Sequence, residues 1–375
     1  MAGIRIQTEQ GIFEKLKLLN WGLVILITMI ASVGFMALYS AAGGSLSPWA
    51  SKQMVRFAFG LLVMIGVALV DIRVWFRLSW IYYGFVLLLL VYVDVAGHIG
   101  MGAQRWINLG FIQLQPSEMM KIAVVLALAR YFNTATSYDM RNIRFLLIPA
   151  AIIGVPVALV MFQPDLGTAV MIILAGVAMF FIAGAPLWMF GTAIAAVAAA
   201  IPIAWQVLHD YQKKRVLTFL NPESDPLGAG YHITQSKIAL GSGGIGGKGF
   251  LQGTQSHLNF LPEKQTDFIF TLWAEEWGLM GGVFLLSLFG LVFVYGLWIA
   301  MRCRHNFGRY VAFGLTMNFS FYVFVNTAMV MGLIPVVGVP LPLISYGGTA
   351  MLTLLFGFGL IMSCNLYKDS KMSRF

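Results

Sequence analysis

Charged side chains are scarce in this chain. Only 10% of its 375 residues are Asp, Glu, Lys or Arg, whereas 59% are hydrophobic and the mean hydropathy is +0.82. A soluble chain of this length needs far more polar surface, so the composition excludes a soluble globular protein. The long apolar runs predict instead an all-α polytopic membrane protein.

Cysteine and nucleotide-binding motifs are also scarce. The two cysteines, Cys303 and Cys364, fall at expected helix ends on the side of the N-terminus, so we expect no disulfide. No Cys/His spacing fits a zinc site. The glycine run 241–249 is not a phosphate-binding P-loop, because Lys248 is followed by Gly249 rather than Ser or Thr. Close backbone packing or a flexible flap is the expected role of this run.

The net charge is +9, but the sequence contains no basic patch interleaved with aromatic residues. This argues against a nucleic-acid partner. The chain also lacks an internal repeat, the sign of many transporters. The apolar runs predict ten spans, with a large extracytoplasmic loop, 207–267, between the seventh and the eighth. Lys and Arg concentrate in short loops on the side of the N-terminus, which predicts that segments 1–20 and 367–375 are both cytoplasmic. The spans are 21–41, 53–70, 78–97, 116–132, 145–162, 165–183, 187–206, 268–300, 309–332 and 343–366.

Asp267 stands at the mouth of the eighth span, directly before an aromatic residue. A carboxylate at a border between water and membrane suits a general base. The alternative is structural, because Thr266 or Asp267 would also cap the helix that follows. Glu263, four residues earlier, has three possible roles: a second functional carboxylate, a cation ligand, or a charged loop residue that faces solvent.

Glu118 and Lys121 open the fourth span. Their spacing of three residues places them on one helix face. Charges in a span are costly unless they are paired or wetted. The two charges therefore either neutralise each other for structural reasons, or Lys121 binds a phosphate and Glu118 orients the lysine side chain.

Three further outer segments carry candidate residues. Asp165 begins the sixth span, where it is either a helix cap or part of a site. Arg105 suits a diphosphate, and Trp106 suits either a sugar face or the membrane interface. Prolines and glycines in 335–348 break the chain around Ser345. Broken backbone at membrane depth normally lines a wet or protein-buried cavity.

Taken together, these segments resemble the SEDS family (shape, elongation, division and sporulation), and its elongation branch more than its division branch. The family order extends over nearly the whole chain, which is far more specific than any single motif. One departure is Gln265, where the family often has His, and it puts in doubt a mechanism that needs an imidazole there. The matching segments are 102–107, 115–121, 163–169, 221–231, 249–256, 260–263, 266–270 and 340–348.

The resemblance implies a peptidoglycan glycosyltransferase of the bacterial inner membrane that polymerises lipid II at the periplasmic face during cell elongation. The family's essential aspartate corresponds to Asp267, the expected general base of an inverting transfer. A divalent cation, Mg²⁺ or Mn²⁺, held by Glu263 or Asp267 is a further expectation, with no organic cofactor. The candidate substrate-binding residues are Arg105, Trp106, Glu118, Lys121, Asp165, Arg215, Glu263 and Ser345.

In this mechanism the donor is a glycan linked to undecaprenyl diphosphate, and Lys121, Arg105, Arg215 or the cation neutralises the leaving diphosphate. The expected partners are a class B penicillin-binding protein, which cross-links the new strand, and other membrane proteins of the elongation complex. Two alternatives are a lipid II flippase and a non-catalytic scaffold. A flippase predicts charges deep in the spans and on both faces, whereas here they crowd the outer ends.

Overall fold

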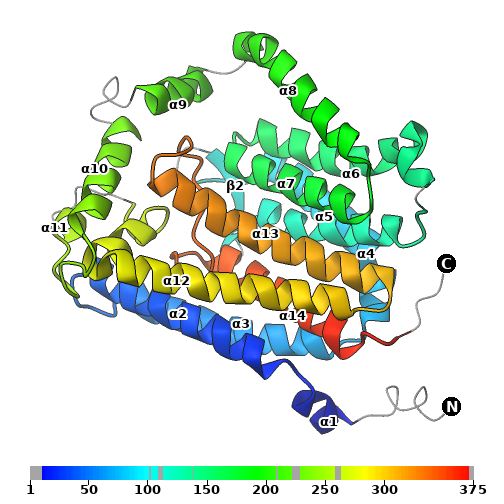
Figure 1. Ribbon diagram of the computed structural model, residues 1–375, viewed down its shortest axis with the longest axis horizontal. Helices are drawn as coiled ribbons and strands as arrows, with labels where there is room; N and C mark the ends of the chain where they lie inside the picture. Colours follow the sequence, from blue (N-terminus) through cyan, green and yellow to red (C-terminus); the bar gives the residue numbers. More distant parts are fainter. Residues whose placement is uncertain are drawn as a thin grey trace.

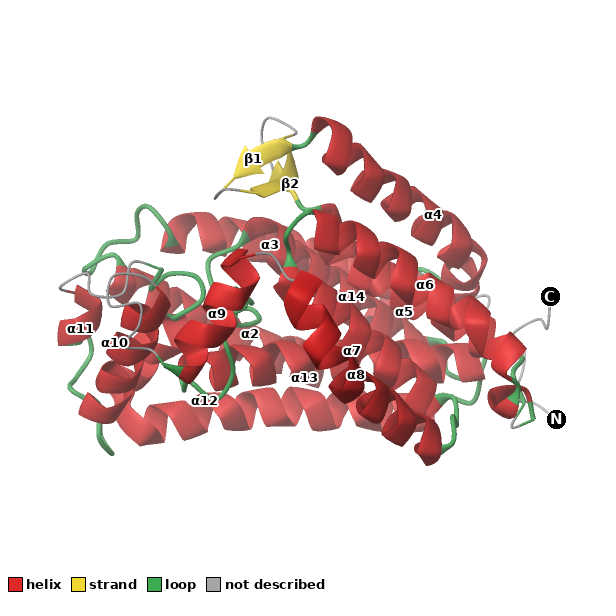
Figure 2. Ribbon diagram, turned by 90° about the horizontal axis from the view of Figure 1, so that it is seen from above, coloured by secondary structure: helices red, strands yellow, loops and turns green. Residues whose placement is uncertain are grey.

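The computed structural model describes residues 11–100, 103–108, 113–136, 138–207, 210–221, 229–257 and 263–370. Its long helices form one bundle, which Figures 1 and 2 show from two directions. In chain order the elements are α1 (Ile12–Lys17), α2 (Trp21–Ala41), α3 (Ala50–Leu69), α4 (Ile72–Ala96), β1 (His98–Gly100), β2 (Ala103–Asn108), β3 (Gln113–Leu114), α5 (Pro116–Phe132), η1 (Asp139–Arg141), α6 (Ile143–Phe162), α7 (Leu166–Ile182), α8 (Leu187–Val207), α9 (Asp210–Leu220), α10 (Ala229–Ser242), α11 (Thr254–His257), α12 (Ile269–Arg302), α13 (Asn306–Val330) and α14 (Gly348–Leu366).

All ten predicted spans coincide with helices, from α2 to α8 and from α12 to α14. In the described residues, seven of them are long and apolar enough to cross a membrane, and α7 and α8 contain shorter apolar segments. Two predicted edges were wrong. The third span begins at Ile72 rather than 78, because the Asp71 carboxylate accepts a hydrogen bond from the Arg73 amide at 2.8 Å and caps α4. The last span begins at Gly348 rather than 343, because the preceding proline-rich segment is not helical.

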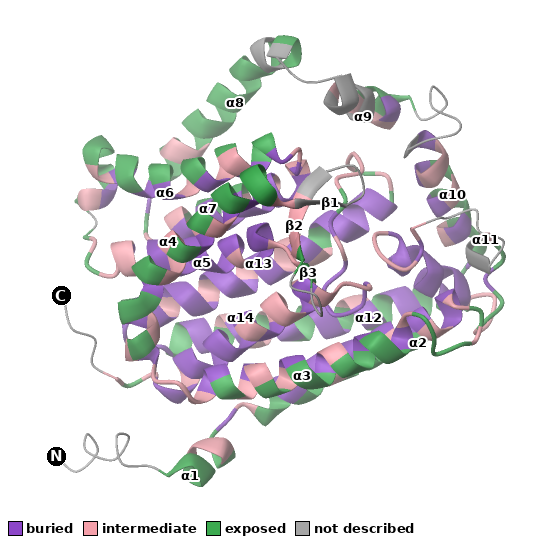
Figure 3. Cartoon of the chain, turned by 180° about the vertical axis from the view of Figure 1, so that it is seen from behind, coloured by how far each residue is buried: buried purple, intermediate pink, exposed green. Residues whose placement is uncertain are grey.

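The remaining predicted span, α5, is the buried centre of the bundle. It packs against α4, α6, α7 and α13, and nearly all of its residues are buried. Its small alanines let neighbouring helices approach closely. The outer helices α3, α4 and α8 instead expose large apolar side chains, as Figure 3 shows by colour. This pattern is that of a multi-pass membrane protein whose outer surface faces lipid.

A small sheet between α4 and α5 is an addition to the predicted all-α class. Strands β1, β2 and β3 are antiparallel neighbours in that order, and Figure 2 shows the first two at the edge of the bundle. Strands β1 and β3 have only three and two residues, too few for an alternating pattern, and the six residues of β2 do not alternate between apolar and polar. The sheet places Arg105 and Trp106 on β2.

The predicted loop 207–267 contains helices α9, α10 and α11. After α10 the glycine run packs against α12 at a kink, where Gly278 has φ 64° and ψ −161°. A Cβ on Gly247 would lie 2.1 Å from the Glu276 carbonyl oxygen, and the Leu279 amide donates to the Gly244 carbonyl at 2.9 Å. The run is therefore packed backbone to backbone, which confirms the first of the two expectations for it.

The end of α14 meets the beginning of the bundle. The Asn365 side-chain amide donates to the Asn20 side-chain oxygen at 2.7 Å, and the Lys15 ammonium lies 5.4 Å from the centre of the Tyr367 ring. Helices α10 and α11 lie at the opposite end of the bundle (Figure 1). The two cysteines form no disulfide: both are free and buried.

Candidate active site

Asp267 lies in the turn 263–268 that precedes α12, and its backbone is held from outside the turn. Three successive carbonyl oxygens each accept one hydrogen bond. The Gln265 carbonyl accepts from the Tyr346 amide at 2.8 Å, and the Thr266 carbonyl accepts from the Ser345 hydroxyl at 2.6 Å. The Asp267 carbonyl accepts from the Asn326 side chain at 2.9 Å. Since Asp267 itself is only partly buried, the turn presents a carboxylate on a fixed backbone.

The structural alternative for Asp267 was wrong. Helix α12 begins at Ile269, and its N-cap position is Phe268, so neither Thr266 nor Asp267 occupies that position. The Thr266 hydroxyl donates instead to the Glu263 carboxylate at 2.9 Å. The Asp267 carboxylate lies close to the next connecting segment, 3.6 Å from the place where a Cβ of Gly338 would be.

The part of this segment around Ser345, residues 341–345, is buried in the protein, as the broken backbone there predicts. A Cβ on Gly34 would lie 2.8 Å from the Ile344 Cα, so only glycine lets α2 approach this segment so closely. The Gln53 side chain donates to the Ser345 carbonyl at 2.9 Å, and the Leu341 amide donates to the Ser345 hydroxyl at 2.7 Å. Ser345 therefore connects α3, its own segment and the turn of Asp267.

Glu263 and Lys264 begin the turn. Lys264 is buried, and desolvation lowers the pKa of its ammonium group. Within the described ranges no cluster of three or more His, Cys, Asp or Glu side chains could hold a metal ion. Mg²⁺ is commonly held by one or two carboxylates together with substrate phosphates. The carboxylates of Glu263 and Asp267 are donors of this kind.

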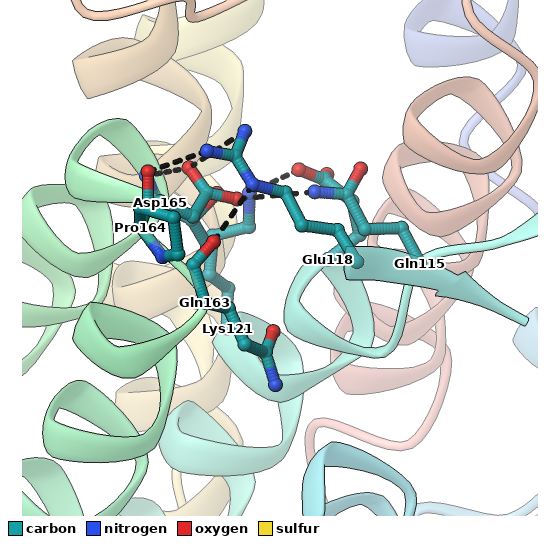
Figure 4. Close-up of polar contacts among 8 residues, drawn as sticks. Gln115, Glu118, Lys121, Gln163, Pro164 and Asp165 are labelled. Atoms are coloured by element: carbon teal, nitrogen blue, oxygen red, sulfur yellow. Dashed lines mark hydrogen bonds and ion pairs between the residues drawn. The ribbon is translucent and has the colours of Figure 1, made fainter. Parts of the chain in front are cut away.

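Arg105 and Asp165 meet in a second polar cluster. The Arg105 guanidinium donates to the Gln163 carbonyl at 3.0 Å and to the Pro164 carbonyl, and it lies 4.0 Å from the Asp165 carboxylate. Figure 4 shows Gln115, at the start of α5, across from the turn of Gln163, Pro164 and Asp165. The Gln115 side chain donates to Asp165 at 3.2 Å. The cluster ties the small sheet, α5 and α7 together.

The structural role predicted for Asp165 is confirmed. Its carboxylate accepts hydrogen bonds from the Thr168 amide at 3.2 Å and the Thr168 hydroxyl at 2.9 Å, and thereby caps α7. Trp106 lies opposite His98 in the sheet and is half-buried. Arg215 lies on α9, and its side chain is outside the described residues. Substrate-binding roles for these residues stay predictions.

Glu118 and Lys121 form the predicted ion pair, and they are buried. Their side chains meet at 2.6 Å, and both are less than one-tenth exposed. Tyr322 on α13 completes the group, because its hydroxyl donates to Glu118 at 2.9 Å and its ring lies 4.3 Å below the Lys121 ammonium. These residues line a cavity of about 20 Å³ between α5, α13 and α14, which has room for about one water molecule.

Three residues of these clusters were missed in the sequence, namely Gln53, Tyr322 and Asn326. Asn326 is fully buried, and it donates both to Asp267 and to the Val339 carbonyl, at 2.7 Å. The signal that could have found it is a lone amide deep in an apolar span, since such a group is costly without partners. Gln53 offers the same signal at the start of α3.

Comparisons with known proteins agree with these features. A model of the cell cycle protein family that includes FtsW, RodA and SpoVE matches residues 15–370. The peptidoglycan glycosyltransferase MrdB of Escherichia coli is 47% identical over 348 residues, which cover 92% of each chain. The peptidoglycan glycosyltransferase RodA of Treponema pallidum is 34% identical over 421 residues, which cover 91% of this chain and 96% of that one.

Two solved structures are similar over almost the full length. A chain from a peptidoglycan synthase complex that coordinates polymerization and crosslinking has a TM-score of 0.82 at 33% identity, covering 94% of this chain and 99% of that chain. The rod shape determining protein RodA of Thermus thermophilus has a TM-score of 0.68 at 29% identity, covering 94% and 97%. From its polytopic helical fold, its family motifs and these matches, the chain belongs to the SEDS family of peptidoglycan glycosyltransferases.

Proposed function

We propose that this chain polymerises lipid II into glycan strands by an inverting glycosyl transfer, with Asp267 as the general base. The observation that carries the assignment is the turn of Asp267, whose three successive carbonyls are bound by Tyr346, Ser345 and Asn326. A general base must be held at hydrogen-bonding distance from the proton it accepts. A partly exposed carboxylate on a fixed backbone meets that requirement.

In the proposed step the 4-hydroxyl of the acceptor GlcNAc attacks C1 of the donor MurNAc. Asp267 accepts the hydroxyl proton as the new C–O bond forms. The bond between C1 and the diphosphate oxygen breaks, and undecaprenyl diphosphate leaves with the electron pair. Because negative charge develops on that diphosphate, a nearby cation lowers the barrier.

The proposed location of this step is the periplasmic face of the inner membrane. Basic residues concentrate in the short loops at the end of the bundle where α1 and the end of α14 meet. Lys and Arg are retained on the cytoplasmic side, so this end is assigned to the cytoplasm. The turn of Asp267 begins α12, whose other end carries Arg302 and lies on the basic side.

The proposed partner is a class B penicillin-binding protein, the transpeptidase that cross-links the product. Support comes from the similarity to a chain of a synthase complex that coordinates polymerization and crosslinking. Other membrane proteins of the elongation complex are further proposed partners. The exposed apolar faces of the outer helices suit contacts with partner helices in the bilayer.

A divalent cation is part of the proposal. Glu263 and Asp267 are the carboxylates that would hold it, and it would supply charge neutralisation for the diphosphate. We expect chelation by EDTA to lower polymerisation at least about tenfold, and added Mg²⁺ or Mn²⁺ to restore it. Binding of Mn²⁺ to the protein, followed by electron paramagnetic resonance, should weaken in Glu263→Gln. Full activity in EDTA, or unchanged Mn²⁺ binding in this variant, would contradict the cation site.

The function is tested by incubating the purified full-length protein in detergent with lipid II. The transpeptidase partner is present and its cross-linking is blocked, so that only strand synthesis is measured. Glycan strands on a gel support the polymerase. Movement of lipid II across vesicles without strands would establish the flippase instead, and neither activity would favour a scaffold.

Asn326 is a positioning residue for the turn of Asp267. Asn326→Leu leaves the carbonyls of Asp267 and Val339 without their donor, which costs about 1–3 kcal/mol of folding free energy. We expect kcat for strand synthesis to fall about 10- to 100-fold with little change in KM, because the carboxylate loses its placement. Hydrogen exchange of the turn should accelerate.

The matched control for this variant is Thr327→Val. Its hydroxyl bonds only to carbonyls of its own helix, those of Val323 and Phe324. This variant should keep kcat within about twofold. Equal losses in both variants would show a general helix defect and would contradict the positioning role.

A further inference from the structure

Arg56, in the second turn of α3, carries a positive charge that the protein does not neutralise. Its guanidinium lies 4.8 Å from the centre of the Tyr346 ring. Its Nη1 atom is buried and has no hydrogen-bond partner, and no carboxylate in the described part of the chain forms an ion pair with it. Buried guanidinium donors are normally satisfied, so an unpartnered one indicates a missing acceptor.

The neighbours of Arg56 connect it to the candidate active site. Tyr346, on which it stacks, donates its amide to the Gln265 carbonyl in the turn of Asp267. Gln53, three residues before Arg56 and therefore on the same face of α3, donates to the Ser345 carbonyl. Tyr346 and Ser345 thus connect the surroundings of the Arg56 guanidinium to the turn of Asp267.

The first turn of α14 adds a second source of positive potential. A Cβ on Gly348 would lie 3.2 Å from the Arg56 Nε, so the guanidinium lies directly against the start of this helix. The N-cap residue is Gly347, which has no side chain to cap the free amides. Free backbone amides at a helix N-terminus, with an arginine beside them, favour the binding of an oxyanion.

Two of the cations proposed for the diphosphate, Lys121 and Arg105, are already engaged within the protein. Lys121 pairs with Glu118 at 2.6 Å and is almost fully buried. Arg105 donates to two carbonyls and lies 4.0 Å from Asp165. Neither has the unfilled donor that Arg56 has, although the sequence places all three near the outer ends of the spans.

We propose that Arg56 binds the diphosphate of a polyprenyl-linked substrate beside Asp267. This inference rests on the proposed function, because it names the residue that receives the charge of the leaving group. The guanidinium is planar, permanently charged and matched to two phosphate oxygens at once. Arg56 lies in the second turn of the apolar helix α3, so a lipid tail would lie along the apolar helices while its phosphates reach the polar turn.

A phosphate at this place has two possible sources, the substrate or an ordinary anionic phospholipid. The test therefore uses the full-length protein in nanodiscs of phosphatidylcholine, which carry no net charge. Fluorescent undecaprenyl diphosphate is the probe, and undecaprenol with the same label is its uncharged control. A second set of nanodiscs contains phosphatidylglycerol.

We expect Arg56→Gln to weaken probe binding in neutral nanodiscs about 10- to 100-fold, and Arg56→Lys to recover part of the loss. Binding of undecaprenol should not change. The control is Lys17→Gln, which removes the same charge from the exposed surface of α1 and should stay within about twofold. The thermal midpoint of Arg56→Gln should not fall, because the substitution removes an unpartnered charge.

Unchanged probe binding in Arg56→Gln, or an equal loss in Lys17→Gln, would overturn the inference. So would an effect of Arg56→Gln that is seen only in nanodiscs with phosphatidylglycerol, since the ligand would then be a bulk lipid headgroup. The proposed function can fail separately. If the wild-type protein makes no strands but binds the probe through Arg56, the polymerase function is refuted and the diphosphate site is still supported.

Discussion

Asp267→Asn is expected to lower the rate of strand synthesis about 10²- to 10⁴-fold while the protein folds normally. Asparagine has nearly the same shape and cannot accept the proton of the acceptor hydroxyl. The backbone contacts of the turn, including the hydrogen bond from Asn326 to the Asp267 carbonyl, do not involve the carboxylate. The N-cap position of helix α12 is occupied by Phe268 and is not changed by the substitution.

The measurement is the initial rate of strand synthesis at saturating lipid II, together with the thermal midpoint in detergent. Asp94→Asn is the matched control, since it removes an exposed carboxylate from the last turn of α4. This control should synthesise strands at the wild-type rate. If Asp267→Asn makes strands at that same rate, the protein is still a glycosyltransferase, but Asp267 is not its general base.

The second large effect concerns the buried ion pair of α5. Lys121→Met leaves the Glu118 carboxylate buried without its cation, with only the Tyr322 hydroxyl as a partner. We expect the free energy of unfolding to fall by about 3–5 kcal/mol. The double variant Glu118→Gln, Lys121→Met removes both charges and should recover most of that loss, because a neutral pair has no uncompensated charge.

Equilibrium unfolding in detergent, arranged as a double-mutant cycle, measures this coupling. A loss of stability in the double variant equal to the sum of the losses in the two single variants would show that the pair contributes no coupling and would contradict a structural role. Strand synthesis by the double variant adds a second result. A stable but inactive double variant would support the predicted phosphate role of Lys121, and an active one would remove Lys121 from the list of substrate-binding residues.

Much of the fold follows from local features of the sequence. Ten apolar segments predicted ten helices, because hydropathy and helix length are properties of neighbouring residues. The cap formed by Asp165 was also predictable, since a cap bonds to an amide only three residues away. The pair of Glu118 and Lys121 follows from a spacing of one helical turn.

The short strands and the helices of the loop 207–267 were not predicted from the sequence. The strands β1 to β3 show no clear alternation, and they are defined by the pairing of each strand with the next. Helices α9 to α11 lie in a polar segment, and α10 is held there by packing against α12. In both cases tertiary contacts override a weak local signal.

The sequence by itself determined that this protein is a helical membrane protein, where most of its spans lie and, through its motifs, its family. Only the tertiary structure decided which polar groups meet. It joined Gln53, Ser345 and Asn326 around the turn of Asp267, engaged Arg105 and Lys121 within the protein, and left Arg56 without an acceptor. The reason is physical: hydropathy and capping act between residues close in the chain, whereas these contacts join residues from different helices, and their partners are set by how the helices pack.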